Sequence, residues 1–231
     1  MALTSAHLFS LRVRRAVGFS LTEVMVVVAI IGIISALAVP NLSSWVAGLR
    51  VKDAARSIAG LLEIARTEAG RTGDNHLVFF GMDAQGNPLP AVNPADPAVR
   101  YAGVAVRDSN QNGQIDGGEV VAGVPPVTDV FWGISSAAVP APSDPDSLGS
   151  FAPGFPGFTF QNAGGAPAQW IAFHPDGVPV AFSAVPYSEA AIGSAGGAVY
   201  VNSPGRDYAA VLRPLGGVRV HAWDSAQGQW R

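Results

Sequence analysis

The amino-acid sequence predicts an α+β fold, in which one long N-terminal helix packs on an antiparallel β-sheet or β-sandwich head. Three observations lead to this fold class. Residues 21–39 are apolar with a single charge, residues 41–69 carry apolar side chains at helical spacing, and the chain beyond them alternates short apolar runs with turn residues. With 231 residues, 27 of them Gly and 18 Pro, the chain suits one turn-rich domain with appendages.

The apolar run at residues 21–39, LTEVMVVVAIIGIISALAV, predicts a membrane-spanning helix. At ~1.5 Å per residue such a helix rises roughly 28 Å, which is close to the hydrocarbon thickness of a bilayer. Arg12, Arg14 and Arg15 precede the run, and no basic residue lies within it. We therefore expect the N-terminus on the cytoplasmic side of the membrane and the rest of the chain exported.

The helix is expected to continue beyond Pro40, which is a candidate kink because proline removes one backbone donor. This second half is amphipathic, and Gly70 and Gly73 are its expected stops. We expect the Trp45 and Leu49 stripe to belong to the core. The apolar positions at helical spacing are Leu42, Trp45, Val46, Leu49, Ala54, Ile58, Leu61, Leu62 and Ala65.

The remainder of the chain is expected to be all β. Turn sequences such as Pro175-Asp176-Gly177 and Gly216-Gly217 separate apolar runs. Residues 135–156 are rich in Pro, Ser and Ala, and we expect them to form a mobile surface loop. The candidate strands are 76–80, 99–107, 119–122, 130–134, 157–161, 169–174, 178–183, 198–202, 208–213 and 218–223.

The lone acid of the apolar run, Glu23, separates three interpretations of the N-terminus. A plain membrane anchor does not explain it, and a secretory signal cut after Ala38 would carry it inside the apolar region. The third interpretation uses the sequence Gly18-Phe19-Ser20-Leu21-Thr22-Glu23, which follows an arginine-rich stretch and begins the apolar helix. This arrangement, over residues 12–45, resembles the class III leader and N-terminal helix of type IV pilins and type II secretion pseudopilins.

The resemblance implies that prepilin peptidase cuts between Gly18 and Phe19 and methylates the new amine of Phe19. Four parts follow: a cleaved leader at 1–18, a transmembrane and polymerisation helix at 19–40, the amphipathic half of the helix at 41–70, and a β-rich head at 71–231. The mature subunit would wait in the inner membrane with its head exported. It would then join other pilin or pseudopilin subunits in a filament in the periplasm or at the cell surface.

Glu23 would be the fifth residue of the mature chain, and its charge needs an explanation. A carboxylate in an apolar membrane segment costs ~2.5–3.5 kcal/mol on insertion scales, so it usually has a partner. The new amine of Phe19 on a neighbouring subunit is the candidate partner during assembly. The alternative is that Glu23 reaches the membrane interface by itself, because it lies only one turn from the start of the helix.

Residues 108–119, DSNQNGQIDGGE, fit the twelve-residue calcium loop of EF-hands. Oxygen ligands are expected from the side chains of Asp108, Asn110, Asn112, Asp116 and Glu119 and from the backbone carbonyl of Gln114. With only three carboxylates, the expected dissociation constant is ~10⁻⁴–10⁻³ M. The alternative is a polar hairpin turn at Asn112-Gly113, a strong hairpin dipeptide.

The C-terminal half resembles the H-type minor pseudopilins and the FimT-like minor pilins through residues 171–177, IAFHPDG, and 216–223, GGVRVHAW. Some FimT-like proteins bind DNA, so the resemblance implies a second hypothesis of nucleic-acid binding through Arg206, Arg213 and Arg219. Gly217 replaces the first arginine of the family's Gly-Arg-Val-Arg pattern. Without residues 1–18 the chain keeps 11 basic and 17 acidic residues, a net charge of −6 that opposes binding through bulk charge.

Composition argues against an enzyme. The chain has no cysteine and therefore neither a disulfide nor a thiolate site. Its 4 histidines are well separated in the sequence and form no metalloprotease pattern. No nucleophile elbow, P-loop or dinucleotide fingerprint is present, so enzyme activity has no positive support.

Overall fold

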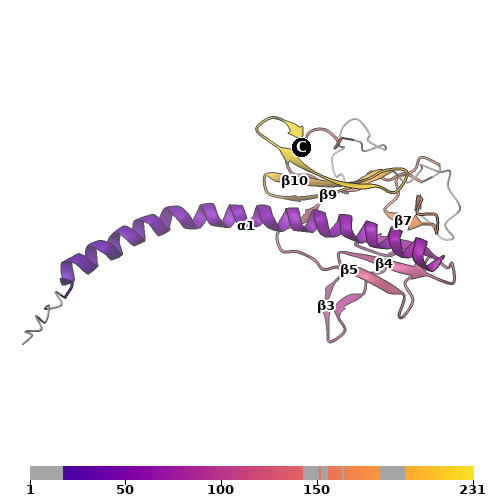
Figure 1. Ribbon diagram of the computed structural model, residues 1–231, viewed down its shortest axis with the longest axis horizontal. Helices are drawn as coiled ribbons and strands as arrows, with labels where there is room; N and C mark the ends of the chain where they lie inside the picture. The colour runs from indigo at the N-terminus through magenta and orange to yellow at the C-terminus, as the bar shows by residue number, and fades with distance from the viewer. Residues whose placement is uncertain (1–17, 143–150, 152–155, 163, 183–195) are drawn as a thin grey trace, which may run out of the picture. The chain divides into compact units, whose positions relative to one another are not determined.

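The computed structural model describes residues 18–142, 151, 156–162, 164–182 and 196–231, with the backbone alone at 37–41, 43 and 44. The chain divides into two compact units, Met1–Ser44 and Trp45–Arg231. Helix α1, Leu21–Thr72, contributes to both units (Figure 1). Its backbone stays helical through Pro40, as expected, and it ends before Gly73, whose φ of 76° stops the helix.

In the part of the head that the structure describes, the strands form two five-stranded antiparallel sheets and a separate hairpin. The first sheet has the order β5-β4-β1-β7-β8, the second has the order β12-β11-β10-β9-β6, and β2 pairs with β3. The described strands are β1 (Asn75–Phe80), β2 (Ala91–Asn93), β3 (Asp96–Arg100), β4 (Gly103–Asp108), β5 (Val120–Val124), β6 (Phe131–Trp132), β7 (Trp170–Phe173), β8 (Pro179–Phe182), β9 (Gly197–Ser203), β10 (Arg206–Leu212), β11 (Val218–Asp224) and β12 (Gln229–Trp230).

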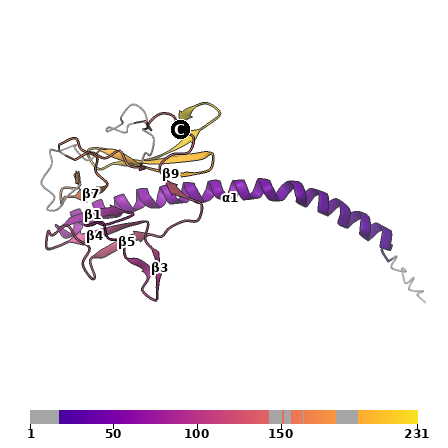
Figure 2. The same ribbon diagram turned by 180° about the vertical axis from the view of Figure 1, so that it is seen from behind.

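The second half of α1 lies between the two sheets, with β4 and β5 on one side and β9 and β10 on the other (Figures 1 and 2). Its buried face consists largely of small residues, including Ala55, Ala65 and Ala69, which are fully buried. Small side chains let both sheets approach the helix closely. The main core therefore joins α1 to the inner faces of both sheets, with Val78 from β1 and Val199 from β9 as examples.

The outer face of each sheet has a core of its own. On the first sheet, Phe79, Trp170 and Phe182 pack together, with ring centroids 5.9–6.4 Å apart. On the second sheet, Tyr200 and Trp230 belong to a cluster covered by residues near Ala137 and Ala141. Both faces of each sheet are thus buried over much of their width, which explains the near-continuous burial along β1, β7 and β9.

The α+β prediction is confirmed, but several predicted elements need correction. The strand expected at 99–107 is two strands, because the chain breaks at Tyr101 and Ala102 between β3 and β4. Residues 157–161 form isolated bridges from Phe158 and Gln161 instead of a strand. The prediction missed β2 and β12, which have only 3 and 2 residues. Much of the segment 135–156, including 143–150, lies outside the described residues.

The prediction that Trp45 and Leu49 belong to the core is wrong. Trp45 is 57% exposed and Leu49 39% exposed, whereas Val51, two residues later, is fully buried. The helical period identifies the apolar face of α1 correctly. It does not show where along that face the sheets begin to cover it.

Candidate functional site

The bond expected to be cleaved, between Gly18 and Phe19, lies directly ahead of α1. Neither residue has regular secondary structure, and Phe19 is 82% exposed. A Cβ added at Gly18 would meet no described atom within 4 Å. An exposed bond outside a helix or strand can enter a peptidase active site. The leader arginines Arg12, Arg14 and Arg15 lie outside the described residues.

Ser20 caps the helix that begins at this bond. Its Oγ accepts a hydrogen bond from the backbone N–H of Glu23 at 3.2 Å, and its carbonyl accepts one from Val24, also at 3.2 Å. Ser20 is therefore the N-cap, and Glu23 occupies the first turn, where the helix dipole favours a carboxylate. The sequence prediction did not include this role, although the Ser-x-x-Glu spacing is itself a capping signal.

Glu23 carries the single charge in the first part of α1, from Leu21 to Ala36. All side chains from Leu21 to Ala36 are exposed, and most are apolar. Among the residues that the structure describes, no cation pairs with Glu23.

Side chains of the predicted span 19–40 are described only as far as Ala36. Within the described part of the chain, no helix combines the length and apolarity needed to cross a bilayer.

The loop at residues 108–119 is organised around Asp108, the last residue of β4. Asp108 is only 1% exposed, and its two carboxylate oxygens accept hydrogen bonds from the backbone N–H groups of Asn112 and Gly113, at 3.0 and 3.1 Å. The side-chain oxygen of Asn110 accepts from Asn112 N–H at 3.1 Å, and that of Asn112 accepts from Gln114 N–H at 2.8 Å. Gly113 has a φ of 67°, which gives the sharp turn that the pattern predicts.

The second half of the loop folds back onto the first. Both side-chain amides of Asn110 and Asn112 donate to Oδ2 of Asp116, at 2.8 and 2.9 Å. The carboxylate of Glu119 accepts from Ser109 Oγ at 3.1 Å and from the backbone N–H of Asp116 at 3.2 Å. The five predicted side-chain ligands are thus linked by hydrogen bonds within one short loop.

The expected ligands share one loop, but their carboxylates do not meet at one point. Within the described residues, no three His, Asp or Glu side chains converge closely enough to hold an ion. The oxygens of Asn110 and Asn112 accept backbone hydrogen bonds, and their amide nitrogens face Asp116. A calcium ion would need these amides to turn, because calcium binds oxygen and not the amide nitrogen.

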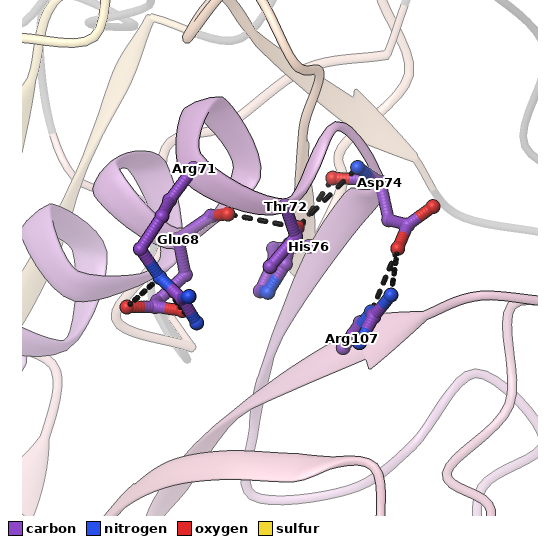
Figure 3. A network of polar contacts seen from close by, with 6 residues as sticks. All are labelled: Glu68, Arg71, Thr72, Asp74, His76 and Arg107. Carbon is purple, nitrogen blue, oxygen red and sulfur yellow. Dashed lines mark hydrogen bonds and ion pairs between the residues drawn. The ribbon is translucent and has the colours of Figure 1, made fainter.

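An ion pair between Arg107 and Asp74 joins the base of this loop to the turn between α1 and β1 (Figure 3). Arg107, next to Asp108, donates from Nε to Oδ2 of Asp74 at 2.7 Å, and its backbone N–H donates to the carbonyl of Glu119 at 2.9 Å. Close by, a hydrogen bond from Arg71 lowers the pKa of Glu68 and raises that of Arg71. The two ends of the loop are therefore held together at the junction of α1 and β1.

The three arginines proposed for nucleic-acid binding do not gather at one place. Arg206 lies at the start of β10, where its guanidinium packs against α1 so closely that a Cβ at Gly48 would overlap it. Arg213 and Arg219 lie at the other end of the β10–β11 hairpin, with Arg219 opposite Val211. The seven residues of β10 therefore separate Arg206 from the other two arginines.

At the end of the β10–β11 hairpin that holds Arg213 and Arg219, His221 lies two residues from Arg219 on the same face of β11. Burial lowers the pKa of His221, and the nearby charges of Arg219 and Arg213 lower it further, whereas a hydrogen bond to the Arg231 backbone raises it. This end of the hairpin thus holds two arginines beside a histidine that prefers its neutral form.

Residues 14–39 match the family model of the prokaryotic N-terminal methylation motif. This motif is typical of type IV pilin-like proteins, and the matched segment contains Gly18, Phe19 and Glu23. Neither a curated protein nor a solved structure matches the chain. The family match covers the N-terminal segment and does not extend to the head.

Proposed function

We propose that this protein is a structural minor pilin or pseudopilin of a type IV pilus or type II secretion filament. Prepilin peptidase removes residues 1–18 and methylates Phe19. The apolar part of α1 anchors the mature subunit in the inner membrane, and the head is exported. Other subunits then bind this helix as the filament grows. The methylation motif at residues 14–39 carries this proposal.

The exposed start of α1 supports the same role. Apolar side chains such as Leu21 and Met25 are 79% and 65% exposed, a state that water disfavours and that lipid or neighbouring helices relieve. Glu23 lies among them without a described cation. The Phe19 amine of an adjacent subunit would neutralise this carboxylate and fix the register between two helices.

The test compares wild type with Glu23→Ala in a bacterium that has prepilin peptidase and a filament system accepting this subunit. Because alanine removes the charge but keeps the apolar helix, the variant should insert into the membrane normally and be depleted from sheared filaments. Glu63→Ala, which removes an exposed acid in the second half of α1, is the matched control and should assemble like wild type. Equal incorporation of all three proteins would contradict the proposed role of Glu23.

We also propose that the loop at residues 108–119 binds calcium weakly. The twelve-residue spacing supports this role, together with the hydrogen bonds that keep Asp108, Asp116 and Glu119 in one short loop with Asn110 and Asn112. Calcium should raise the melting temperature of wild type with a midpoint of ~0.1–1 mM. Glu119→Ala, which removes one of the expected carboxylate ligands, should abolish the shift, and magnesium serves as the control ion. Identical responses of the two proteins to calcium would contradict the site.

Nucleic-acid binding is the second candidate function. The one observation that favours it is that Arg213 and Arg219 both lie near His221, at one end of the β10–β11 hairpin. In a gel shift at low salt, Arg219→Gln should weaken DNA binding, whereas Arg206→Gln at the other end of the hairpin should not. Binding should also fall as salt rises. Absence of binding at both low and high salt would remove this function.

A further inference from the structure

A cavity opens in the head where the two sheets meet the middle of α1. It has a volume of about 250 Å³. Ala54 and Ile58 of α1 form its floor, and residues 124–127, after β5, form one side. Trp132 of β6 lines it from the second sheet. A cavity of ~150 Å³ suffices for a benzene molecule in a protein interior, so this one has room for a single ring with a short chain.

The walls of the cavity are aromatic and held in place. The ring of Trp132 packs against Phe80 and Phe158, with centroids 6.0 and 5.4 Å away. The ring of Tyr101 lies across β5 at Gly123, where an added Cβ would fall 2.5 Å from Tyr101 Cε1. Gly123 therefore makes the space in which the Tyr101 ring sits. These fixed rings give the cavity a preformed apolar surface.

One cation accompanies this apolar surface. Arg100, the last residue of β3, is exposed and is the single charged residue among the described residues that line the cavity. Its Nη1 donates to the carbonyl of Leu89 at 2.9 Å, which orients the guanidinium. Within the described part of the chain, no carboxylate forms an ion pair with Arg100. The guanidinium therefore keeps donors for an anionic group.

We propose that this cavity binds a small aromatic or aliphatic carboxylate. The apolar part of the ligand would lie against Trp132 and Tyr101 above Ile58, and its carboxylate would accept hydrogen bonds from Arg100. Charge complementarity selects this class, because a neutral apolar molecule would leave the guanidinium unused and a small inorganic anion would leave the rings uncovered. The inference stands apart from filament assembly, since it uses none of the residues proposed for processing.

The experiment measures fluorine NMR line broadening of para-fluorophenylpropionate in the presence of the full chain in a non-ionic detergent. The uncharged para-fluorophenylpropanol is the matched ligand, and a detergent-only sample corrects for partition into micelles. Wild type should broaden the carboxylate signal in a saturable manner. Arg100→Gln should weaken carboxylate binding by about tenfold, the effect of losing one charge-assisted hydrogen bond, and should leave binding of the alcohol unchanged.

Two further variants distinguish binding in the cavity from nonspecific binding elsewhere on the protein. Arg56→Gln removes an exposed arginine of α1 that does not line the cavity, and it should bind like wild type. Ala102→Leu places extra carbon atoms in the cavity and should reduce binding of both ligands; its melting curve shows whether the head remains folded. The proposal is overturned if wild type does not bind the carboxylate, or if Arg100→Gln binds it as tightly as wild type.

Discussion

Asp207 offers the sharpest test of how the head is held together. This carboxylate is fully buried on β10 and accepts five hydrogen bonds from a segment about 70 residues away in the sequence. The backbone N–H groups of Ser135, Ser136 and Ala137 lie 2.6, 2.7 and 2.6 Å from its oxygens, and the two serine hydroxyls lie 2.9 and 2.7 Å away. Asp207 thus fastens the covering segment to the outer face of the second sheet.

The expected cost of Asp207→Ala follows from what replaces each hydrogen bond. A hydrogen bond to a charged group contributes ~1.5–3 kcal/mol, but five such terms would approach the whole stability of a domain and do not add. Ser135 and Ser136 are exposed, so water can replace their bonds, whereas Ala137 is buried and its N–H would lose its partner. We therefore expect a loss of about 3 kcal/mol, or a fall in melting temperature of roughly 6–12 °C.

The assay is urea and thermal unfolding of the full chain in a non-ionic detergent, followed by circular dichroism. Asp96→Ala is the control, because Asp96 is exposed and accepts one local hydrogen bond, from Ala98 N–H at 3.2 Å. Its cost should stay within about 0.5 kcal/mol. Equal stability of Asp207→Ala and Asp96→Ala would refute the reasoning, because the buried hydrogen bonds would then contribute nothing measurable.

Two other predictions concern the head. Because the pKa of His221 is lowered in the folded state, its contribution to stability is fully present above about pH 6.5 and is lost as the pH falls toward the folded-state pKa. The melting temperature of His221→Gln should therefore fall less than that of wild type between neutral pH and about pH 5. An equal fall in both proteins would contradict this. Gly157→Ala should cost ~2–4 kcal/mol, because φ is 96° and the added Cβ would fall 2.6 Å from the backbone nitrogen of Gly133. Gly86→Ala, at φ 81° but with open space, should cost only about 1 kcal/mol, and equal losses in urea titrations would show that crowding at Gly157 is unimportant.

Local patterns predicted most of the fold. The apolar period identified α1 and its end near Gly73, and turn residues marked the hairpins that follow β7 and β10. Such features depend on neighbouring residues and therefore leave a signal in a short window of sequence. The short strands β2 and β12 leave almost none, because 2 or 3 residues show no alternation.

Features that depend on distant residues could not be predicted. Nothing near Asp207 indicates that its partners are Ser135 to Ala137, and nothing near Gly123 shows that the ring of Tyr101 covers it. The loop around Asp108 is the opposite case, since its ligands lie within 12 residues and their hydrogen bonds follow the spacing of the pattern. Whether that loop binds calcium stays a prediction.

Mass spectrometry of the N-terminal peptide from the native protein tests the central claim most directly. Material purified from cells that contain prepilin peptidase should begin at Phe19 and carry one methyl group on its amine. Material from cells without the peptidase should retain the leader with Arg12, Arg14 and Arg15. A native chain that keeps the leader arginines in both cases, or that begins at Val39 after a cut behind Ala38, would contradict the account.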